Sequence, residues 1–512
     1  MAEGRREAEV VLRLDGITKR FGPVTANDDV SLTLRRGEVV ALLGENGAGK
    51  TTLMNVLFGL YAADAGRVEV MGEALPPGDP GAALARGVGM VHQHFTLAGN
   101  LTVLDNIVLG TRPIWQPFSG RRAARRKVDA LMADYGLRVD PGARVGTLSV
   151  GERQRVEILK ALYRDARILI LDEPTAVLTP QEAGDLFATL RRAVKKGLSV
   201  IFISHKLHEV TAICDRVVVL RAGRVAGAAD VTDIDRHEMA RMMVGAEIAT
   251  PKPRPARPGI AVVALDGVST PDRGAAPGLR SVDLTLRAGQ ITGLAGVAGN
   301  GQAALADLLS GMTQPARGRF EVRGAEPEAW SPRAAVAAGI ARIPEDRHAT
   351  GAIGDFDLIE NAILEGYADP PMSRVGWLDR RAARDWARTI IEAYDVRCPG
   401  PETPARLLSG GNMQKLILGR VLMTGPSVVL ANQPARGLDV GALTYVHRQL
   451  LTARDRGAAV LLISEDLDEV IDLSDVIHVI SGGRLSPGFP RGNKTVADLG
   501  VMMAGQGFDD AA

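Results

Sequence analysis

The sequence predicts an α/β protein that contains two tandem copies of one domain, each built around a parallel sheet flanked by helices. Short runs that are apolar throughout, such as residues 168–171 and 200–203, alternate with amphipathic stretches such as residues 151–163. Uninterrupted apolar runs are typical of strands that are buried on both faces of a parallel sheet. The second observation is an internal repeat. The third is the length of 512 residues, which suffices for two to four domains of roughly 100–250 residues.

The internal repeat is defined by two pairs of segments with the same spacing. Residues 39–53 (VVALLGENGAGKTTL) resemble residues 291–305 (ITGLAGVAGNGQAAL), so that position 50 aligns with position 302, an offset of 252 residues. The same offset aligns residues 87–93 with residues 339–345. Two independent matches at one spacing indicate a duplication. Later matches are offset by 260 residues, which places a small insertion in the second copy.

A short proline-rich segment, residues 250–259 (TPKPRPARPG), separates the two copies. Alternating prolines favour an extended, semi-rigid spacer over a packed element. We therefore expect a first domain at residues 9–248, a linker at residues 249–259 and a second domain at residues 260–508.

Composition and charge argue against several classes of protein. The chain has 61 basic and 60 acidic side chains, and a net charge of +1 gives no support for a nucleic-acid partner. No apolar stretch approaches the roughly 18–20 residues of a membrane-spanning helix, and the N-terminal residues lack the apolar core of a signal peptide. We therefore expect a cytosolic protein. Cys214 and Cys398 lack CxxC spacing, which argues against a metal site and a disulfide framework.

The first copy carries a phosphate-binding loop of the Walker A type. The pattern Gly44-x-x-x-x-Gly49-Lys50-Thr51 follows an apolar run and precedes a helical pattern, which is the context that this motif requires. Its glycines allow a tight turn that points backbone N–H groups and a helix N-terminus at phosphates. Lys50 is expected to reach the β- and γ-phosphates of ATP, and the Thr51 hydroxyl to hold Mg²⁺. The ATP-binding residues expected in this loop are Gly44, Glu45, Asn46, Gly47, Ala48, Gly49, Lys50, Thr51 and Thr52.

Two carboxylates end a buried strand further along the chain. Residues 168–174 read ILILDEP, which places Asp172 and Glu173 where a magnesium ligand and a catalytic base are needed. We expect Asp172 to bind Mg²⁺ and Glu173 to activate the attacking water. The alternative is that both residues only cap a loop.

Residues 148–155 (LSVGERQR) resemble the signature helix of the ATP-binding-cassette (ABC) ATPases. The resemblance implies two tandem ABC-type P-loop nucleotide-binding domains, each with a RecA-like parallel-sheet core, an antiparallel β subdomain and a helical signature subdomain. It also implies that Gln93 lies in the Q-loop, as a catalytic residue and magnesium ligand. His205 would be the switch histidine, which senses the γ-phosphate and orients water. His92 and His94 are expected to be loop residues without such a role.

Phe21 lies at the distance from the Walker A motif at which this family carries the aromatic residue that stacks on adenine. The resemblance therefore implies adenine binding by Phe21. A core aromatic residue is the alternative reading of the same position.

The second copy has lost the catalytic groups of the first. Aligned positions show Lys50 replaced by Gln302, Thr51 by Ala303, Gln93 by Glu345, Asp172 by Asn432, Glu173 by Gln433 and His205 by Glu465. A general base alone is worth about 10²–10⁴ in rate, so we expect no turnover at these positions. The loop glycines remain, which leaves weak nucleotide binding open. The second copy nevertheless keeps a complete signature at residues 408–414 (LSGGNMQ), where the first copy has Val150 in place of the first glycine of the pair.

In the domain arrangement of this family, the substituted residues of the two copies fall into one of the two ATP sites. ABC domains work as head-to-tail pairs, in which each ATP lies between the Walker motifs of one domain and the signature of the other. The resemblance thus implies that the two halves pair within one chain and form one competent site. This site would combine Lys50, Thr51, Gln93, Asp172, Glu173 and His205 with Ser409, Gly410, Gly411 and Asp439. The other site would combine the degenerate residues Gln302, Ala303, Glu345, Asn432, Gln433 and Glu465 with the weakened first signature.

Over its whole length the chain resembles the double-cassette ATPases of bacterial importers for simple sugars and nucleosides. Residues 89–95 (GMVHQHF), 343–347 (IPEDR) and 431–439 (ANQPARGLD) look most like the nucleoside branch, and the ribose and galactose type is the alternative. The resemblance implies ATP and Mg²⁺ as cofactors. It also implies two transmembrane permease subunits and an extracytoplasmic solute-binding protein as partners, with this subunit on the inner face of the plasma membrane.

Two readings from other classes are weaker. Soluble twin-cassette proteins that act on ribosomes typically have two intact sites and a long charged linker. This chain has one damaged site and a short proline-rich linker. A non-catalytic regulatory pair of cassettes does not agree with the intact Walker motifs of the first copy.

Overall fold

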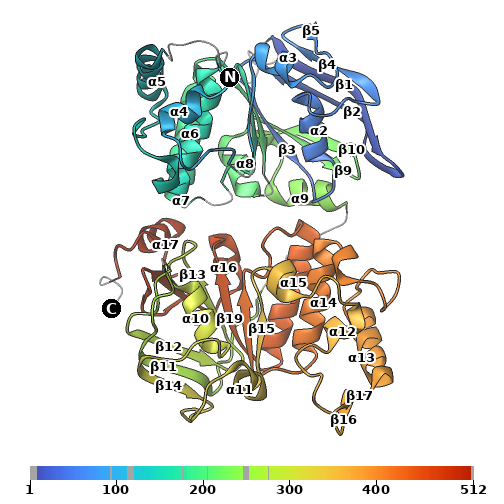
Figure 1. Cartoon of the computed structure of the whole chain (residues 1–512), viewed down its shortest axis with the longest axis vertical. Helices are drawn as coiled ribbons and strands as arrows, with labels where there is room; N and C mark the ends of the chain where they lie inside the picture. Colours follow the sequence, from blue (N-terminus) through green and yellow to red (C-terminus); the bar gives the residue numbers. More distant parts are fainter. Residues whose placement is uncertain are drawn as a thin grey trace. The chain divides into compact units, whose positions relative to one another are not determined.

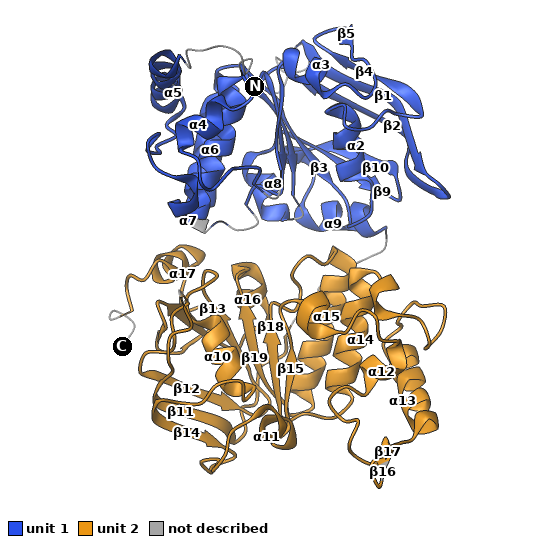
Figure 2. Cartoon of the chain, viewed as in Figure 1, with its two compact units in different colours: residues 1–248 blue, residues 249–512 orange. Residues whose placement is uncertain are grey.

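A computed structural model describes residues 9–92, 95–111, 120–175, 178, 180–204, 206–245, 253–274 and 276–508. The α/β class predicted from the sequence is confirmed. The chain divides into two compact units, residues 1–248 and residues 249–512, which Figure 2 shows in different colours. The domain and linker bounds expected from the sequence stay predictions.

A mainly parallel sheet forms the centre of the first unit (Figure 1). Its strands are β3 (Val39–Leu43), β6 (Val88–Val91), β7 (Ile168–Asp172), β8 (Ser199–Ile203), β9 (Arg216–Arg221) and β10 (Arg224–Asp230). They lie in the order β10-β9-β3-β8-β7-β6, and neighbours pair in parallel except for β9 with β10. Strands β3, β7 and β8 are buried almost throughout, as their uninterrupted apolar runs predict.

An antiparallel sheet shares its hydrophobic core with the parallel one. Its strands are β1 (Val10–Phe21), β2 (Val24–Arg35), β4 (Ala65–Val70) and β5 (Glu73–Ala74), in the order β2-β1-β4-β5. Buried Leu12 and Leu14 of β1 belong to the same apolar cluster as Val40 and Leu42 of β3. The antiparallel subdomain that the family resemblance implies is therefore present.

Helices flank the two sheets of the first unit. They are α2 (Lys50–Leu57), α3 (Pro80–Ala85), α4 (Val103–Val108), α5 (Arg121–Tyr135), α6 (Val150–Tyr163), α7 (Pro180–Lys195), α8 (Leu207–Ile213) and α9 (Arg236–Val244), with short 3₁₀ turns η1 (Val145–Thr147) and η2 (Val231–Asp233). Helices α4, α5 and α6 pack against one another, and α6 also contacts β6 of the parallel sheet. This group contains the first signature helix, α6.

The second unit repeats the two sheets. The antiparallel sheet contains β11 (Ala261–Ser269), β12 (Val282–Arg287) and β14 (Arg317–Val322), in the order β12-β11-β14. The mainly parallel sheet contains β13 (Ile291–Ala295), β15 (Ile340–Ile343), β18 (Val428–Asn432), β19 (Ala459–Ser464), β20 (Val476–Ser481), β21 (Arg484–Leu485) and β22 (Phe489–Pro490). Its order is β15-β18-β19-β13-β20-β21, and β22 also pairs with β20. The counterpart of β10 is thus divided into β21 and β22 around Pro487, which has no N–H to donate to a ladder.

The helices of the second unit follow the same plan. They are α10 (Gln302–Leu309), α11 (Pro332–Ala337), α12 (Leu358–Ala362), α13 (Arg380–Ala393), α14 (Gly410–Leu422), α15 (Val440–Asp455), α16 (Leu467–Leu473) and α17 (Val496–Met503), with a π turn η3 (Arg347–Gly351) and a 3₁₀ turn η4 (Ala405–Leu407). A hairpin of β16 (Ser373–Arg374) and β17 (Trp377–Leu378) lies in the stretch where the sequence predicts an insertion. Within the described ranges, no helix is both long and apolar enough to cross a bilayer.

Candidate functional site

The Walker A loop of the first unit joins β3 to the N-terminus of α2. Gly44 and Gly49 have φ angles of 150° and 96°, in the left-handed region that favours glycine. A Cβ atom on Gly44 would overlap the carbonyl oxygen of Leu220, and one on Gly49 would overlap that of Ala26. Both the backbone conformation and the available space therefore require glycine at these two positions. The loop leads directly into the first turn of α2, whose N–H groups can bind phosphate.

Lys50 lies across this loop. Its Nζ donates hydrogen bonds to the carbonyl oxygens of Gly44 at 2.8 Å and Glu45 at 2.9 Å. Burial lowers the pKa of the Lys50 ammonium, and the nearby carboxylates of Glu173 and Asp172 oppose that shift. The structure thus brings the Walker A lysine together with the two acidic residues predicted for the same site.

Glu173 follows β7 in a strained backbone conformation. Its φ is 46°, in the left-handed region that non-glycine residues rarely adopt, and its N–H donates to the carbonyl oxygen of Ile203 at 2.9 Å. Such strain costs on the order of 1–3 kcal/mol and is found mainly at functional sites. The predicted role of Glu173 as the base stays a prediction.

Asp172 is the last residue of β7. Burial is the largest cause of the raised pKa of its carboxyl group, the negative charge of Glu173 adds to it, and Lys50 and His92 oppose it. His92 was expected to be a loop residue without a role, yet it directly follows β6, which pairs with β7. The parallel pairing of these strands brings His92 to the edge of the sheet where Asp172 lies.

A buried carboxylate behind the site was not predicted from the sequence. Glu209 of α8 is almost completely buried and accepts hydrogen bonds from the hydroxyls of Thr175 at 2.6 Å and Ser204 at 2.9 Å. It therefore connects the segment after Glu173 to the segment before His205. Gln93, His94 and His205 themselves lie outside the described residues, so their roles stay predictions.

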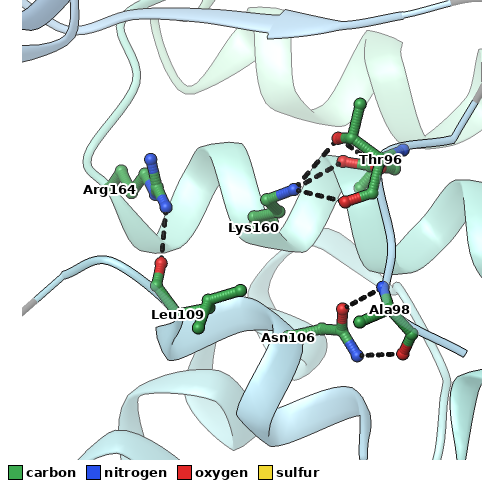
Figure 3. A network of polar contacts seen from close by, with 7 residues as sticks. Thr96, Ala98, Asn106, Leu109, Lys160 and Arg164 are labelled. Carbon is green, nitrogen blue, oxygen red and sulfur yellow. Dashed lines mark hydrogen bonds and ion pairs between the residues drawn. The ribbon is translucent and has the colours of Figure 1, made fainter. Parts of the chain in front are cut away.

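The segment that follows Gln93 is attached to the first signature helix. The carboxylate of Glu157 on α6 accepts hydrogen bonds from the backbone N–H of Thr96 at 2.7 Å and from its hydroxyl at 3.1 Å. Figure 3 shows Lys160 of α6 reaching the carbonyl and hydroxyl oxygens of Thr96, and Asn106 bonded twice to the backbone of Ala98. Side-chain hydrogen bonds from two residues of α6 thus hold this segment at Thr96.

Phe21 ends β1 at the surface. Its side chain is 44% exposed and packs edge to face on Tyr61, with ring centroids 5.4 Å apart. The alternative that Phe21 is a core aromatic residue is therefore wrong. Its predicted contact with adenine stays a prediction.

The degenerate loop of the second unit keeps the backbone of the first but closes on itself. Gln302 Nε2 donates to the carbonyl oxygen of Val297 at 2.8 Å, which repeats the bond of Lys50 to Glu45. Gln302 Oε1 also accepts the backbone N–H of Asn300 at 3.0 Å. An uncharged, buried side chain thus uses an N–H group that a phosphate would need.

The end of β18 shows the same retained backbone with altered chemistry. Gln433 has a φ of 51°, and its N–H donates to the carbonyl oxygen of Ile463 at 2.8 Å, as Glu173 does to Ile203. Asn432 is buried, and Glu345 forms an ion pair with Arg436. Glu465 follows β19, and Ala303 presents a methyl group where the first copy has a hydroxyl.

The two signature helices begin with equivalent serine caps. Ser149 Oγ accepts the backbone N–H of Glu152 at 3.3 Å, in a capping box. Ser409 Oγ accepts the backbone N–H of Asn412 at 3.5 Å and its side-chain amide at 2.9 Å. The caps are therefore similar, and the two signatures differ in what surrounds their glycines.

Glu182 of α7 lies against the first signature. A Cβ atom on Gly151 would overlap the Glu182 carboxylate, whereas the nearest atom to one on Gly411 is the methyl carbon of Ala442, at 3.5 Å. Ala442 is the counterpart of Glu182 at the offset of 260 residues. A carboxylate thus lies beside Gly151 of the first signature, and an alanine methyl group takes its place beside Gly411 of the second.

Asp439 caps the helix that follows the second Walker B strand. Its Oδ1 accepts the backbone N–H of Ala442 at 2.7 Å at the start of α15. This contact gives Asp439 a structural role within its own unit. Its predicted contribution to an ATP site stays a prediction.

Comparison with known proteins gives a family match in both copies. A model of the family described as "ABC transporter" matches residues 27–176 and 279–436. These ranges contain both Walker A positions, both Walker B positions and both signatures.

Relatives of similar length match almost the whole chain. A guanosine import ATP-binding protein of Bacillus subtilis, NupO, is 44% identical over 97% of this chain and 98% of its own length. A nucleoside import ATP-binding protein of Lactococcus lactis, NupA, is 40% identical over 98% and 99%. A ribose import ATP-binding protein of Rubrobacter xylanophilus, RbsA 1, is 40% identical over 97% and 98%.

One solved structure is similar in fold over most of the chain. The archaeal ribosome recycling factor aABCE1, in complex with the stalk protein aP1, has a TM-score of 0.64 and covers 93% of this chain and 90% of its own. Because it is only 17% identical, this likeness concerns the fold alone.

Proposed function

The chain belongs to the ABC transporter family and is an ABC-type ATPase, and from this premise we propose that it energises a nucleoside importer through one composite ATP site. The observation that carries the importer proposal is the similarity of 44% and 40%, over nearly the full length, to proteins named for guanosine and nucleoside import. The relative named for ribose import is 40% identical, so a sugar importer is the second candidate.

The proposed chemistry uses backbone and side-chain groups of the first unit. The N–H groups at the start of α2 and the Lys50 ammonium bind the β- and γ-phosphates, and the glycine loop fixes their direction. The Glu173 carboxylate, held by its strained backbone, takes the proton from the water that attacks the γ-phosphate. Together these residues orient the phosphates and supply the base.

The oxygen donors near Lys50 fit Mg²⁺. Thr51 offers a hydroxyl and Asp172 a carboxylate, and the raised pKa of Asp172 reflects a partly buried negative charge that a cation would stabilise. When bound, Mg²⁺ would neutralise charge on the phosphate oxygens. Thr51 and Asp172 are the residues that we propose to hold it, with Gln93 as a further ligand.

The asymmetry of the two units supports a single competent site made by both. The first unit has the catalytic groups but a signature with Val150 and the Glu182 carboxylate beside it. The second unit has a self-closed phosphate loop but a signature in which Gly411 faces the Ala442 methyl group in place of a carboxylate. We propose that ATP bound by the first unit is completed by Ser409, Gly410, Gly411 and Asp439. ATP would then favour the closed pair, and hydrolysis would let it reopen.

We predict that Mg²⁺ binding weakens as the pH falls. Protons and Mg²⁺ compete for the Asp172 carboxylate, and its raised pKa means that protonation begins at a higher pH than for an exposed aspartate. Each pH unit below that pKa should cost about tenfold in the affinity contributed by this ligand. The measurement is a Mg²⁺ titration of fluorescent ATP analogue binding to the full chain at several pH values.

The matched control is Asp172→Asn, in which the titrating ligand is absent. Titration of the nucleotide itself is common to both proteins, so a steeper pH dependence in the unmodified chain isolates Asp172. Equal pH dependence in the two proteins would contradict this role for Asp172.

Copurification tests the importer proposal. We expect the chain to copurify with two transmembrane permeases, and its ATPase activity in that complex to rise when a solute-binding protein loaded with nucleoside is added. Stimulation by a ribose-loaded protein alone would favour the sugar importer. Association with ribosomes in place of membranes would refute both.

A further inference from the structure

The segment that replaces the Q-loop in the second unit is fastened to the residues that precede Asp439. The Glu345 carboxylate pairs with the Arg436 guanidinium. Arg347 Nη1 donates to the carbonyl oxygen of Arg436 at 2.9 Å, and Nη2 donates to that of Gly437 at 3.4 Å. Glu345 and Arg347, two positions apart in one segment, therefore contact the Arg436 side chain and the backbone of residues 436–437.

The same guanidinium lies against the second signature. A Cβ atom on Gly410 would be 3.1 Å from Arg347 Nη2 and 3.3 Å from Nε, closer than ordinary van der Waals contact. Arg347 Nε is buried and has no hydrogen-bond partner among the described residues. Arg347 therefore fills the space between the first turn of α14 and residues 436–437.

The segment is also held at its far end. Asp346 accepts hydrogen bonds from the backbone N–H groups of His348 and Ala349, both at 2.9 Å, and so caps the turn η3. The carbonyl oxygen of Gly351, which ends η3, accepts a hydrogen bond at 2.8 Å from the buried Arg420 of α14. The signature helix and the segment of Arg347 are thus connected at two places.

The first copy has different residues at the positions that match Arg347 and Gly410. At the matching offsets, Phe95 stands in place of Arg347 and Val150 in place of Gly410. The glycine that admits the guanidinium and the arginine that uses the space occur together in the second copy, and both are absent from the first. The arrangement belongs to the copy whose signature is complete.

We propose that Arg347 is a positioning residue. It fixes Ser409–Gly411 and Asp439 relative to one another, so that together they complete the ATP site of the first unit. This inference rests on the proposed composite site. A guanidinium can donate to two carbonyl oxygens in a fixed fork, which a lysine ammonium does not reproduce. Hydrogen-bond donors that are fixed before the reaction need no reorganisation during it. Loss of the fixed arrangement of Ser409–Gly411 and Asp439 would therefore slow hydrolysis more than it weakens ATP binding.

The test is steady-state ATPase kinetics of the full chain carrying Arg347→Ala, Arg347→Lys or Gly410→Val. Arg347→Ala should lower kcat by about tenfold to a hundredfold, the loss expected for a charged hydrogen-bonding group, with a much smaller change in KM. Arg347→Lys should recover only part of this loss. Gly410→Val should lower kcat similarly, and the double variant Arg347→Ala with Gly410→Val should be little worse than either single variant, since both act on one contact.

Arg319→Ala is the matched control, because Arg319 lies on β14 and forms exposed ion pairs with Glu321 and Glu326. It should keep wild-type kcat. If Arg347→Ala does not fold, the kcat of Gly410→Val tests the inference in its place. Wild-type kcat in either foldable variant overturns the inference, as does full additivity in the double variant. If Ser409→Arg also remains active, the composite site itself fails. If Ser409→Arg is inactive while Arg347→Ala and Gly410→Val are active, only the role of Arg347 fails.

Discussion

Replacement of Glu173 by glutamine should lower steady-state ATP hydrolysis by about 10²–10⁴-fold, the usual contribution of a general base, and leave ATP binding intact. The amide has nearly the same shape as the carboxylate but cannot accept the proton of the attacking water. The strained φ of 46° and the bond to Ile203 need no carboxylate, so the local structure should persist. Phosphate release measures the loss. Nucleotide retained after rapid desalting should show that the variant is trapped in the closed, ATP-bound state.

The second unit supplies matched controls for this experiment. Gln433 has the same backbone conformation as Glu173, so Gln433→Asn, which tolerates that conformation, should leave turnover close to wild type. In the same way Lys50→Ala should stop turnover and Gln302→Ala should change it little. Equal losses in the variants of both units would contradict a single competent site.

The parts of the site that lie in continuous sequence could be predicted from it. The Walker A loop is determined by its own glycines, because φ angles at Gly44 and Gly49 require that residue. The strand before Asp172 could be recognised from its uninterrupted apolar run, which reflects burial on both faces. Alignment of the two copies was then sufficient to identify the degenerate loop of the second copy.

Contacts that depend on packing between distant elements could not be predicted. Glu182 reaches the first signature only because α7 lies beside α6, and nothing in the residues around Glu182 indicates that contact. Glu209 is one of many acidic helix residues until the fold buries it behind the site. His92 lies beside Asp172 because β6 pairs in parallel with β7. A prediction of that strand pairing would have been needed to place His92 there.

Arginine in place of Ser409 should abolish ATP hydrolysis, whereas arginine in place of Ser149 should leave most of it. In the proposed composite site, Ser409 faces the γ-phosphate of the bound ATP, and a long cationic side chain there would prevent closure. Ser149 would face the degenerate site, where Gln302 already closes the phosphate loop and Glu182 stands beside the signature. The two substitutions therefore test which signature completes the working site.

The two variants are matched in their structural cost. Both serines cap a signature helix through a side-chain oxygen, so each substitution should lose a similar cap, worth about 0.5–2 kcal/mol. A difference in activity between them then reflects function rather than stability. Thermal unfolding of both variants would verify the match.

The most direct measurement is the steady-state ATPase rate of full-length Ser409→Arg and Ser149→Arg, purified and assayed side by side. One composite site, with catalytic residues from the first unit and the signature from the second, predicts an inactive Ser409→Arg and an active Ser149→Arg. Greater damage from Ser149→Arg would contradict the assignment of the two signatures, and equal damage would contradict the existence of a single competent site.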